Sequence, residues 1–167
     1  MDQESKKSAR QWALRALGRR MHTGHEIRMG LSRRGFSDDI AGDIVDDLSR
    51  MGYINDLDFT RAWVTSRSVH QMHGRLRLLR DLAIKGIPDE MAEQVLKELL
   101  PDEDEIAIAT RAAEKKLRTM GTGGKATDSA MVAKSRERVY RYLRSRGFTT
   151  RVISLAMAGF TFEEDPS

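Results

Sequence analysis

Apolar residues recur along the chain three and four positions apart, with polar and charged residues between them, as on one face of an α-helix. No stretch alternates apolar and polar residues in the manner of a half-buried strand. The spacing predicts nine helices and an all-α fold of three tandem three-helix repeats, helix-turn-helix-like units that form an elongated array. We expect the repeats at residues 9–52, 53–101 and 102–160, with a loop at 119–133 in the third, an N-terminal tail at 1–8 and an acidic C-terminal tail at 161–167.

The second helix of each repeat ends in the same way, with a glycine followed by a large apolar residue. The pairs are Gly35-Phe36, Gly86-Ile87 and Gly147-Phe148. When the glycines are aligned, the apolar positions on either side match: Ile27 with Leu78 and Val139, Leu31 with Leu82 and Leu143, Ile40 with Met91 and Val152, and Ile44 with Val95 and Ala156. Tandem copies of one helical unit are typical of repeat arrays. We expect the three glycines to adopt positive φ at helix C-termini.

Capping residues mark several helix starts. Thr23 and Glu26 have the spacing of a capping box, and Ser37 precedes the third helix as an N-cap. Asn55 and Asp56 suit the start of the fourth helix, and Pro88 suits the first turn of the sixth. These signals predict the same helix boundaries as the apolar spacing.

Composition excludes several classes of protein. The 167 residues include 40% hydrophobic and 32% charged residues and no cysteine, which excludes disulfides and thiolate metal sites. No apolar run approaches the ~20 residues of a membrane span, and the N-terminus lacks the apolar core of a signal peptide. We therefore expect a cytoplasmic protein that does not associate with membranes and acts as a monomer.

Charge alternates in phase with the repeats. Net charge is +6 over residues 1–35, −6 over 36–60, +5 over 61–87, −7 over 88–107 and +9 over 108–151. The basic second helices are either solvated faces balanced by neighbouring acids or a repeated footprint for a polyanion or an acidic protein surface. The candidate partner-binding residues are Arg28, Arg33, Arg34, Arg67, Arg75, Arg77, Arg80, Lys85, Arg138, Arg141, Arg144 and Arg146.

No motif predicts catalysis, a metal or a cofactor. The stretch from Gly123 to Thr127 lacks the glycine spacing and the following hydroxyl of a phosphate-binding loop. The histidines form two pairs at i, i+3 spacing, His22 with His25 and His70 with His73, without a clear carboxylate partner. The helices that follow the glycines are acidic in the first two repeats, which disfavours DNA reading in the major groove. We expect a protein that is not an enzyme and has no cofactor.

The middle of the chain resembles a known family. Gly52-Tyr53-Ile54-Asn55-Asp56 with Phe59 is similar to a signature of the RecX proteins, which regulate the RecA recombinase. The resemblance continues through Ser66-Arg67-Ser68, Gly74, Arg77-Leu78, Asp81-Leu82 and Lys85-Gly86-Ile87, and through Thr23, Glu26-Ile27, Leu31 and Arg34-Gly35-Phe36 in the first repeat. It covers about residues 9 to 160, and Arg75 stands where family members often carry proline.

The resemblance implies a curved, all-helical protein that acts in DNA repair, recombination and the SOS response. Its expected partners are RecA and the RecA filament on single-stranded DNA. The expected effect is inhibition of the recombinase, ATPase and coprotease activities of RecA, with possible direct binding to DNA. A stand-alone nucleic-acid-binding helical protein that uses the basic second helices is the alternative function.

Overall fold

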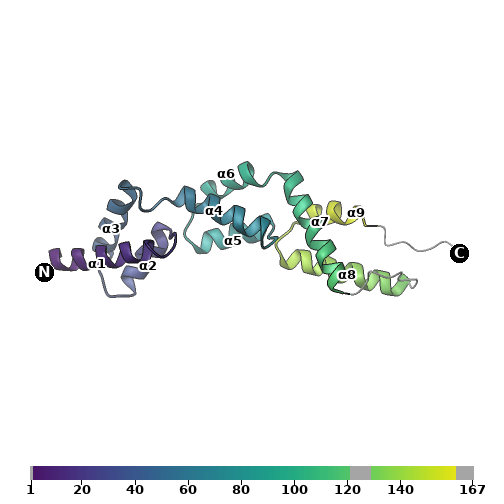
Figure 1. The fold of residues 1–167 in the computed structure, drawn as a ribbon, viewed down its shortest axis with the longest axis horizontal. Coiled ribbons are helices and arrows are strands. Elements are labelled where there is room, and N and C mark those ends of the chain that lie inside the picture. Colours follow the sequence, from purple (N-terminus) through teal and green to yellow (C-terminus); the bar gives the residue numbers. More distant parts are fainter. Residues whose placement is uncertain (1, 121–128, 161–167) are drawn as a thin grey trace. The chain divides into compact units, whose positions relative to one another are not determined.

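The computed structural model describes residues 2–120 and 129–160, and its secondary structure in that part is entirely helical (Figure 1). The nine described helices confirm the predicted all-α repeat fold. They are α1 (Asp2–Leu17), α2 (Gly24–Ser32), α3 (Asp38–Arg50), α4 (Asp56–Val69), α5 (Arg75–Ile84), α6 (Asp89–Leu99), α7 (Asp102–Thr119), α8 (Ser129–Ser145) and α9 (Thr150–Ala158). We refer to α1–α3, α4–α6 and α7–α9 as the first, second and third triplets.

Two predicted boundaries are wrong. Residues 2–8 belong to α1 and do not form a tail. The buried Ala9 and Ala13 hold this helix in place, and its first turns extend N-terminal to them. Thr119 and residues 129–133 of the predicted loop are helical, since α7 ends at Thr119 and α8 begins at Ser129. Residues 121–128, with the stretch from Gly123 to Thr127, and the predicted acidic tail at 161–167 lie outside the described residues.

The predicted helix caps form as expected. The Thr23 hydroxyl accepts a hydrogen bond from the Glu26 N–H, and the Glu26 carboxylate accepts one from the Thr23 N–H, which completes the capping box. Ser37 accepts from the Ile40 N–H, and Asn55 accepts from the Asp58 N–H. These side chains satisfy backbone donors that a helix N-terminus leaves unpaired.

The three aligned glycines all have positive φ, as predicted: +84° at Gly35, +74° at Gly86 and +87° at Gly147. Behind each glycine the next N–H donates to the carbonyl of the aligned leucine, as Phe36 does to Leu31, Ile87 to Leu82 and Phe148 to Leu143. This is the bonding of a helix end whose last residue is left-handed. It fixes the direction in which the chain leaves each second helix.

The residues described form two compact units. One comprises Met1–Trp63 and Asp81–Glu93, and the other comprises Val64–Arg80 and Gln94–Ser167. The division passes through the second triplet, so the assignment of residues 53–101 to a repeat of its own stays a prediction. The elongation and curvature of the array also stay predictions.

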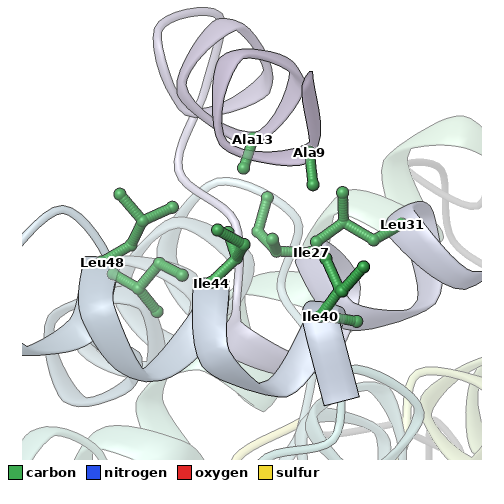
Figure 2. Packing of buried hydrophobic residues seen from close by; sticks show 9 residues of the cluster. Ala9, Ala13, Ile27, Leu31, Ile40, Ile44 and Leu48 are labelled. Atoms are coloured by element: carbon green, nitrogen blue, oxygen red, sulfur yellow. The ribbon is translucent and has the colours of Figure 1, made fainter. Parts of the chain in front are cut away.

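The core of the first triplet lies where α1 crosses α2 and α3 (Figure 2). Ala9 and Ala13 of α1 point toward apolar side chains of the other two helices, and their small size lets the helices approach closely. The Trp12 ring occupies the space beside Gly30, where an added Cβ would lie 2.3 Å from a ring carbon. The aligned positions before the glycine are fully buried in every triplet: Ile27, Leu78 and Val139, and Leu31, Leu82 and Leu143.

Candidate partner interface

The start of α2 is docked onto the glycine turn that follows α5, within the first unit. The Thr23 hydroxyl donates to the Lys85 carbonyl at 2.7 Å, and the Gly24 N–H donates to the Asp56 carboxylate of α4 at 2.9 Å. Gly86 lies against His25, because a Cβ on this glycine would be 2.3 Å from the His25 Cβ. A carboxylate and a carbonyl of the second triplet therefore satisfy the helix start of the first.

The same arrangement recurs in the second unit, between α5 and the third triplet. The Gly74 and Leu76 N–H groups donate to the carbonyls of Arg146 and Gly147 at 2.9 and 3.0 Å. The Arg75 N–H donates to the Glu105 carboxylate of α7 at 2.7 Å. We call these two contacts, between a second-helix start and the glycine turn of the next triplet, the docking junctions.

The basic residue just before each glycine stacks on an aromatic ring. The Arg34 guanidinium lies 4.2 Å from the Trp12 ring centre, Lys85 Nζ lies 4.4 Å from that of Trp63, and the Arg146 guanidinium lies 5.0 Å from that of Tyr142. Such cation–π contacts stabilise the fold by about 0.5–2 kcal/mol each. Three of the twelve predicted partner-binding bases therefore contact the protein's own aromatic residues.

Lys85 also forms an ion pair at the first docking junction. Its ammonium lies 2.8 Å from the Glu26 carboxylate, and both side chains are mostly buried. Burial raises the pKa of Glu26, but hydrogen bonds from Lys85, Arg20 and the Thr23 N–H outweigh it and lower the pKa to about 2. The ionised carboxylate thus contributes to the stability of this junction.

Arg75 and Glu105 occupy the second docking junction. The Glu105 side chain is 2% exposed, and burial raises its pKa, against the opposing effects of the Arg75 N–H and guanidinium. Arg75 is only 22% exposed, and its guanidinium also donates to the Leu100 carbonyl at 2.9 Å. Charge reversal at Arg75 is therefore expected to destabilise the fold.

Three other predicted bases also contact the protein. Arg77 donates to the Ser145 carbonyl, Arg67 donates to the Gln71 side chain, and Arg141 pairs with Glu137 on the surface of α8. Arg146 donates to the Gln71 carbonyl in addition to its contact with Tyr142. These contacts order the side chains in the second unit.

The remaining predicted bases are exposed. Within residues 2–120 and 129–160 they make no hydrogen bond or ion pair, although the Arg28 guanidinium lies against Gly42. They occur on or directly after the second helix of each triplet. They are Arg28 on α2 and Arg33 at its C-cap, Arg80 on α5, and Arg138 and Arg144 on α8. We call these five side chains the free arginines.

Bases at the ends of first helices also gather beside the second helices, and the sequence reasoning missed them. Arg15, Arg19 and Arg20 line a hollow between α1 and α2, and Lys116 lines a second hollow with Arg138 and Arg141. Acids of α3 neutralise only the other end of α1, where Lys6 pairs with Asp43 and Arg10 with Asp47. The excess of basic residues at 10–20 was visible in the sequence, but their position beside α2 was not.

Metal-ligating side chains do not cluster in the described part of the chain: no group of three or more histidine or carboxylate side chains there is placed to hold an ion. Among the described helices none is long and apolar enough to span a membrane. The described part of the chain is therefore an all-α repeat protein. Some of its basic side chains stabilise the fold through internal contacts, and the others are exposed to solvent.

Comparison with known proteins identifies the family. Residues 9–48 match the first three-helix domain of RecX, and residues 55–96 match the second. The chain is 32% identical over 146 residues to the regulatory protein RecX of Pelodictyon phaeoclathratiforme, a match that covers 87% of this chain and 84% of the relative. It is 33% identical over 147 residues to that of Chlorobium phaeobacteroides, which covers 88% and 89%.

A solved structure has the same fold. The crystal structure of RecX from Lactobacillus salivarius superposes with a TM-score of 0.78 at 20% identity, over 93% of this chain and 96% of that one. The chain belongs to the RecX family of regulatory proteins.

Proposed function

We propose that the protein regulates RecA by binding the RecA filament on single-stranded DNA in the cytoplasm, and that it inhibits the recombinase, ATPase and coprotease activities of RecA without being an enzyme itself. Membership of the RecX family carries this proposal. A protein built of tandem triplets presents similar surfaces at intervals, which suits a partner that is itself a repeating polymer.

The free arginines are the side chains best suited to contact the filament. They carry planar guanidinium groups with five N–H donors, which pair with carboxylates and phosphates in a bidentate manner. Because they make no polar contact within the described part of the chain, binding a partner does not require breaking an internal ion pair. We therefore narrow the proposed interface from twelve bases to these five.

A charge-reversal variant tests this interface. Arg33→Glu, Arg80→Glu and Arg144→Glu together change one free arginine on, or directly after, the second helix of each triplet. Lys97→Glu, Arg111→Glu and Lys115→Glu form the matched control, since these exposed residues of α6 and α7 give the same change in net charge. Exposed bases contribute little to stability, so circular dichroism is expected to show both variants folded.

Co-sedimentation with RecA filaments on single-stranded DNA is the measurement. The second-helix variant is expected to lose binding by tenfold or more, as charge-assisted contacts at an interface contribute a few kcal/mol. The control variant is expected to bind within about threefold of the wild type, because distant charges are screened beyond ~10 Å at 0.1 M salt. Equal binding by both variants would exclude the second helices as the contact surface.

A further inference from the structure

The hollow at the C-terminal end of α1 has features that the proposed function does not use. Its volume is about 630 Å³, within the ~300–1,000 Å³ of many ligand sites. No aspartate or glutamate lines it. The lining residues are Trp12, Arg15, Ala16, Arg19, Arg20, His22 and Arg34.

Positive charge in this hollow is not neutralised by the protein. Arg15 and Arg19 are exposed and make no hydrogen bond or ion pair with any described residue. Arg20 shares the Glu26 carboxylate with Lys85, and the acids of α3 pair with the opposite end of α1. The hollow is thus a concave surface with uncompensated guanidinium groups, which attracts anions.

Arg34 is held in a fixed position at the wall of the hollow. Its guanidinium stacks on the Trp12 ring at 4.2 Å and donates to the Gly30 carbonyl at 3.0 Å. The Arg34 side chain remains exposed. A guanidinium plane backed by an aromatic ring is a surface on which a nucleobase stacks, as bases do on arginine planes in single-stranded complexes. Because the fold already orders the group, stacking costs little additional side-chain entropy.

We propose that this hollow binds a nucleotide unit of single-stranded DNA, with the base on the Arg34–Trp12 pair and the neighbouring phosphates on Arg15 and Arg19. The Arg34–Trp12 pair offers a plane for a base, and the guanidinium groups of Arg15 and Arg19 lie beside it for the phosphates joined to that base. A run of acidic side chains offers carboxylates but no aromatic ring for that plane, whereas every nucleotide of a DNA strand carries both a base and a phosphate. The site lies beside the C-terminal end of α1. It goes beyond the proposed function, because it assigns the binding of a DNA strand to one hollow and to named residues that do not belong to the five free arginines.

Fluorescence anisotropy of a labelled oligothymidylate, titrated with the full chain in the absence of RecA at several salt concentrations, tests the site. Arg15→Gln with Arg19→Gln is expected to weaken binding at least tenfold at low salt. It is also expected to reduce the slope of log K against log salt by about 1.4, since each phosphate contact on a single strand contributes ~0.7. Lys6→Gln with Arg10→Gln removes the same charge from the same helix and is expected to change affinity less than twofold.

Arg34→Lys separates stacking from charge. Lysine keeps the positive charge but has no plane, so affinity for the oligonucleotide is expected to fall about fivefold or more with the salt slope unchanged. Free thymidine monophosphate is the probe for a mononucleotide site and is expected to compete only at concentrations at least a hundredfold above the oligonucleotide. If thymidine monophosphate competed as well as the oligonucleotide at the same phosphate concentration, the ligand would be a free nucleotide and not the DNA strand.

Three further results would overturn the proposal. The first is an equal loss of affinity for the oligonucleotide in Arg15→Gln/Arg19→Gln and in Lys6→Gln/Arg10→Gln. The second is displacement of the labelled oligonucleotide by polyglutamate as effectively as by unlabelled oligonucleotide. The third is that the folded wild type does not bind the oligonucleotide at low salt. The last result, obtained while binding to RecA filaments persists, would remove the nucleotide site and leave the proposed function standing. If the protein bound the oligonucleotide but not RecA filaments, the nucleotide site would stand and the proposed function would be contradicted.

Discussion

The basic residue before each of the three aligned glycines contributes to the fold and to the charge pattern at once. Arg34, Lys85 and Arg146 each lie over an aromatic ring, and Lys85 also neutralises Glu26 at a mostly buried position. In a charge count these residues are indistinguishable from the free arginines. Their contacts make them part of the structural framework, whereas the side chain of Arg33, one position before Arg34, is exposed and makes no polar contact with the described residues.

The three glycines are predicted to differ in their tolerance of alanine. Gly35→Ala is expected to cost about 1 kcal/mol, because positive φ is strained for a residue with a side chain and a Cβ there meets nothing within 4 Å. Gly86→Ala and Gly147→Ala are expected to cost about 2 kcal/mol or more, since the Cβ would lie 2.3 Å from the His25 Cβ or 2.5 Å from the Arg77 nitrogen. Urea unfolding of the three variants measures the difference, and equal losses would contradict tight docking at the two turns.

Glu26 gives a pH-dependent prediction. Its pKa falls from an ordinary 4.5 to about 2 in the folded state, so its carboxylate stabilises the protein above pH 4.5, and this contribution is lost as the pH falls toward 2. The loss is about 3 kcal/mol for a shift of this size. Urea unfolding between pH 2 and 7 is expected to show a flatter profile for Glu26→Gln than for the wild type. Glu4→Gln is the control on an exposed site, and a Glu26→Gln profile parallel to that of the wild type would disprove this role.

At the scale of elements, the docking junction is the unit that repeats. Each junction joins the start of a second helix to a carboxylate and to carbonyls of the following triplet, through Asp56 and Lys85 in one unit and through Glu105 and Arg146 in the other. Unpaired helix N–H groups would otherwise need water or another cap. The helices therefore depend on contacts with the next triplet, as expected of a repeat protein.

Truncation is predicted to expose this dependence. A chain ending at Pro101 loses the Glu105 carboxylate and the carbonyls of Arg146 and Gly147, which accept hydrogen bonds from the start of α5. We expect its melting temperature to fall by several degrees and its helicity per residue to drop, because each removed bond leaves a backbone donor unpaired. Thermal unfolding followed by circular dichroism measures both. A truncated chain that melted at the temperature of the full chain would show that the two parts are independent.

The elements themselves were predictable from local signals. Apolar spacing, Thr23 with Glu26 as a capping box and the three glycines were enough to predict nine helices and their turns. The start of α1 was missed because residues 2–7 are polar and carry no apolar spacing, while the helix is held by Ala9 and Ala13 further along. The docking junctions could not be predicted, because residues 30 to 72 positions apart meet there.

At the scale of the molecule, positive charge is distributed unevenly over the described residues. Acids of α3 neutralise the first part of α1, junction residues neutralise one another, and the free arginines remain unpaired within the described residues. The sequence predicted the basic second helices and missed Arg15 and Arg19, because only the fold brings the end of α1 beside α2. It also could not separate Arg75 from Arg80, since burial and partners depend on tertiary contacts.

The most direct test of the central claim is the RecA ATPase on single-stranded DNA, measured at increasing concentrations of this protein. We predict a dose-dependent decrease in ATP hydrolysis by the wild type and by Lys97→Glu/Arg111→Glu/Lys115→Glu. For Arg33→Glu/Arg80→Glu/Arg144→Glu, the protein concentration that gives half-maximal inhibition of ATP hydrolysis is expected to rise tenfold or more. Unchanged ATP hydrolysis at saturating concentrations of the folded wild-type protein would contradict its assignment as an inhibitor of RecA.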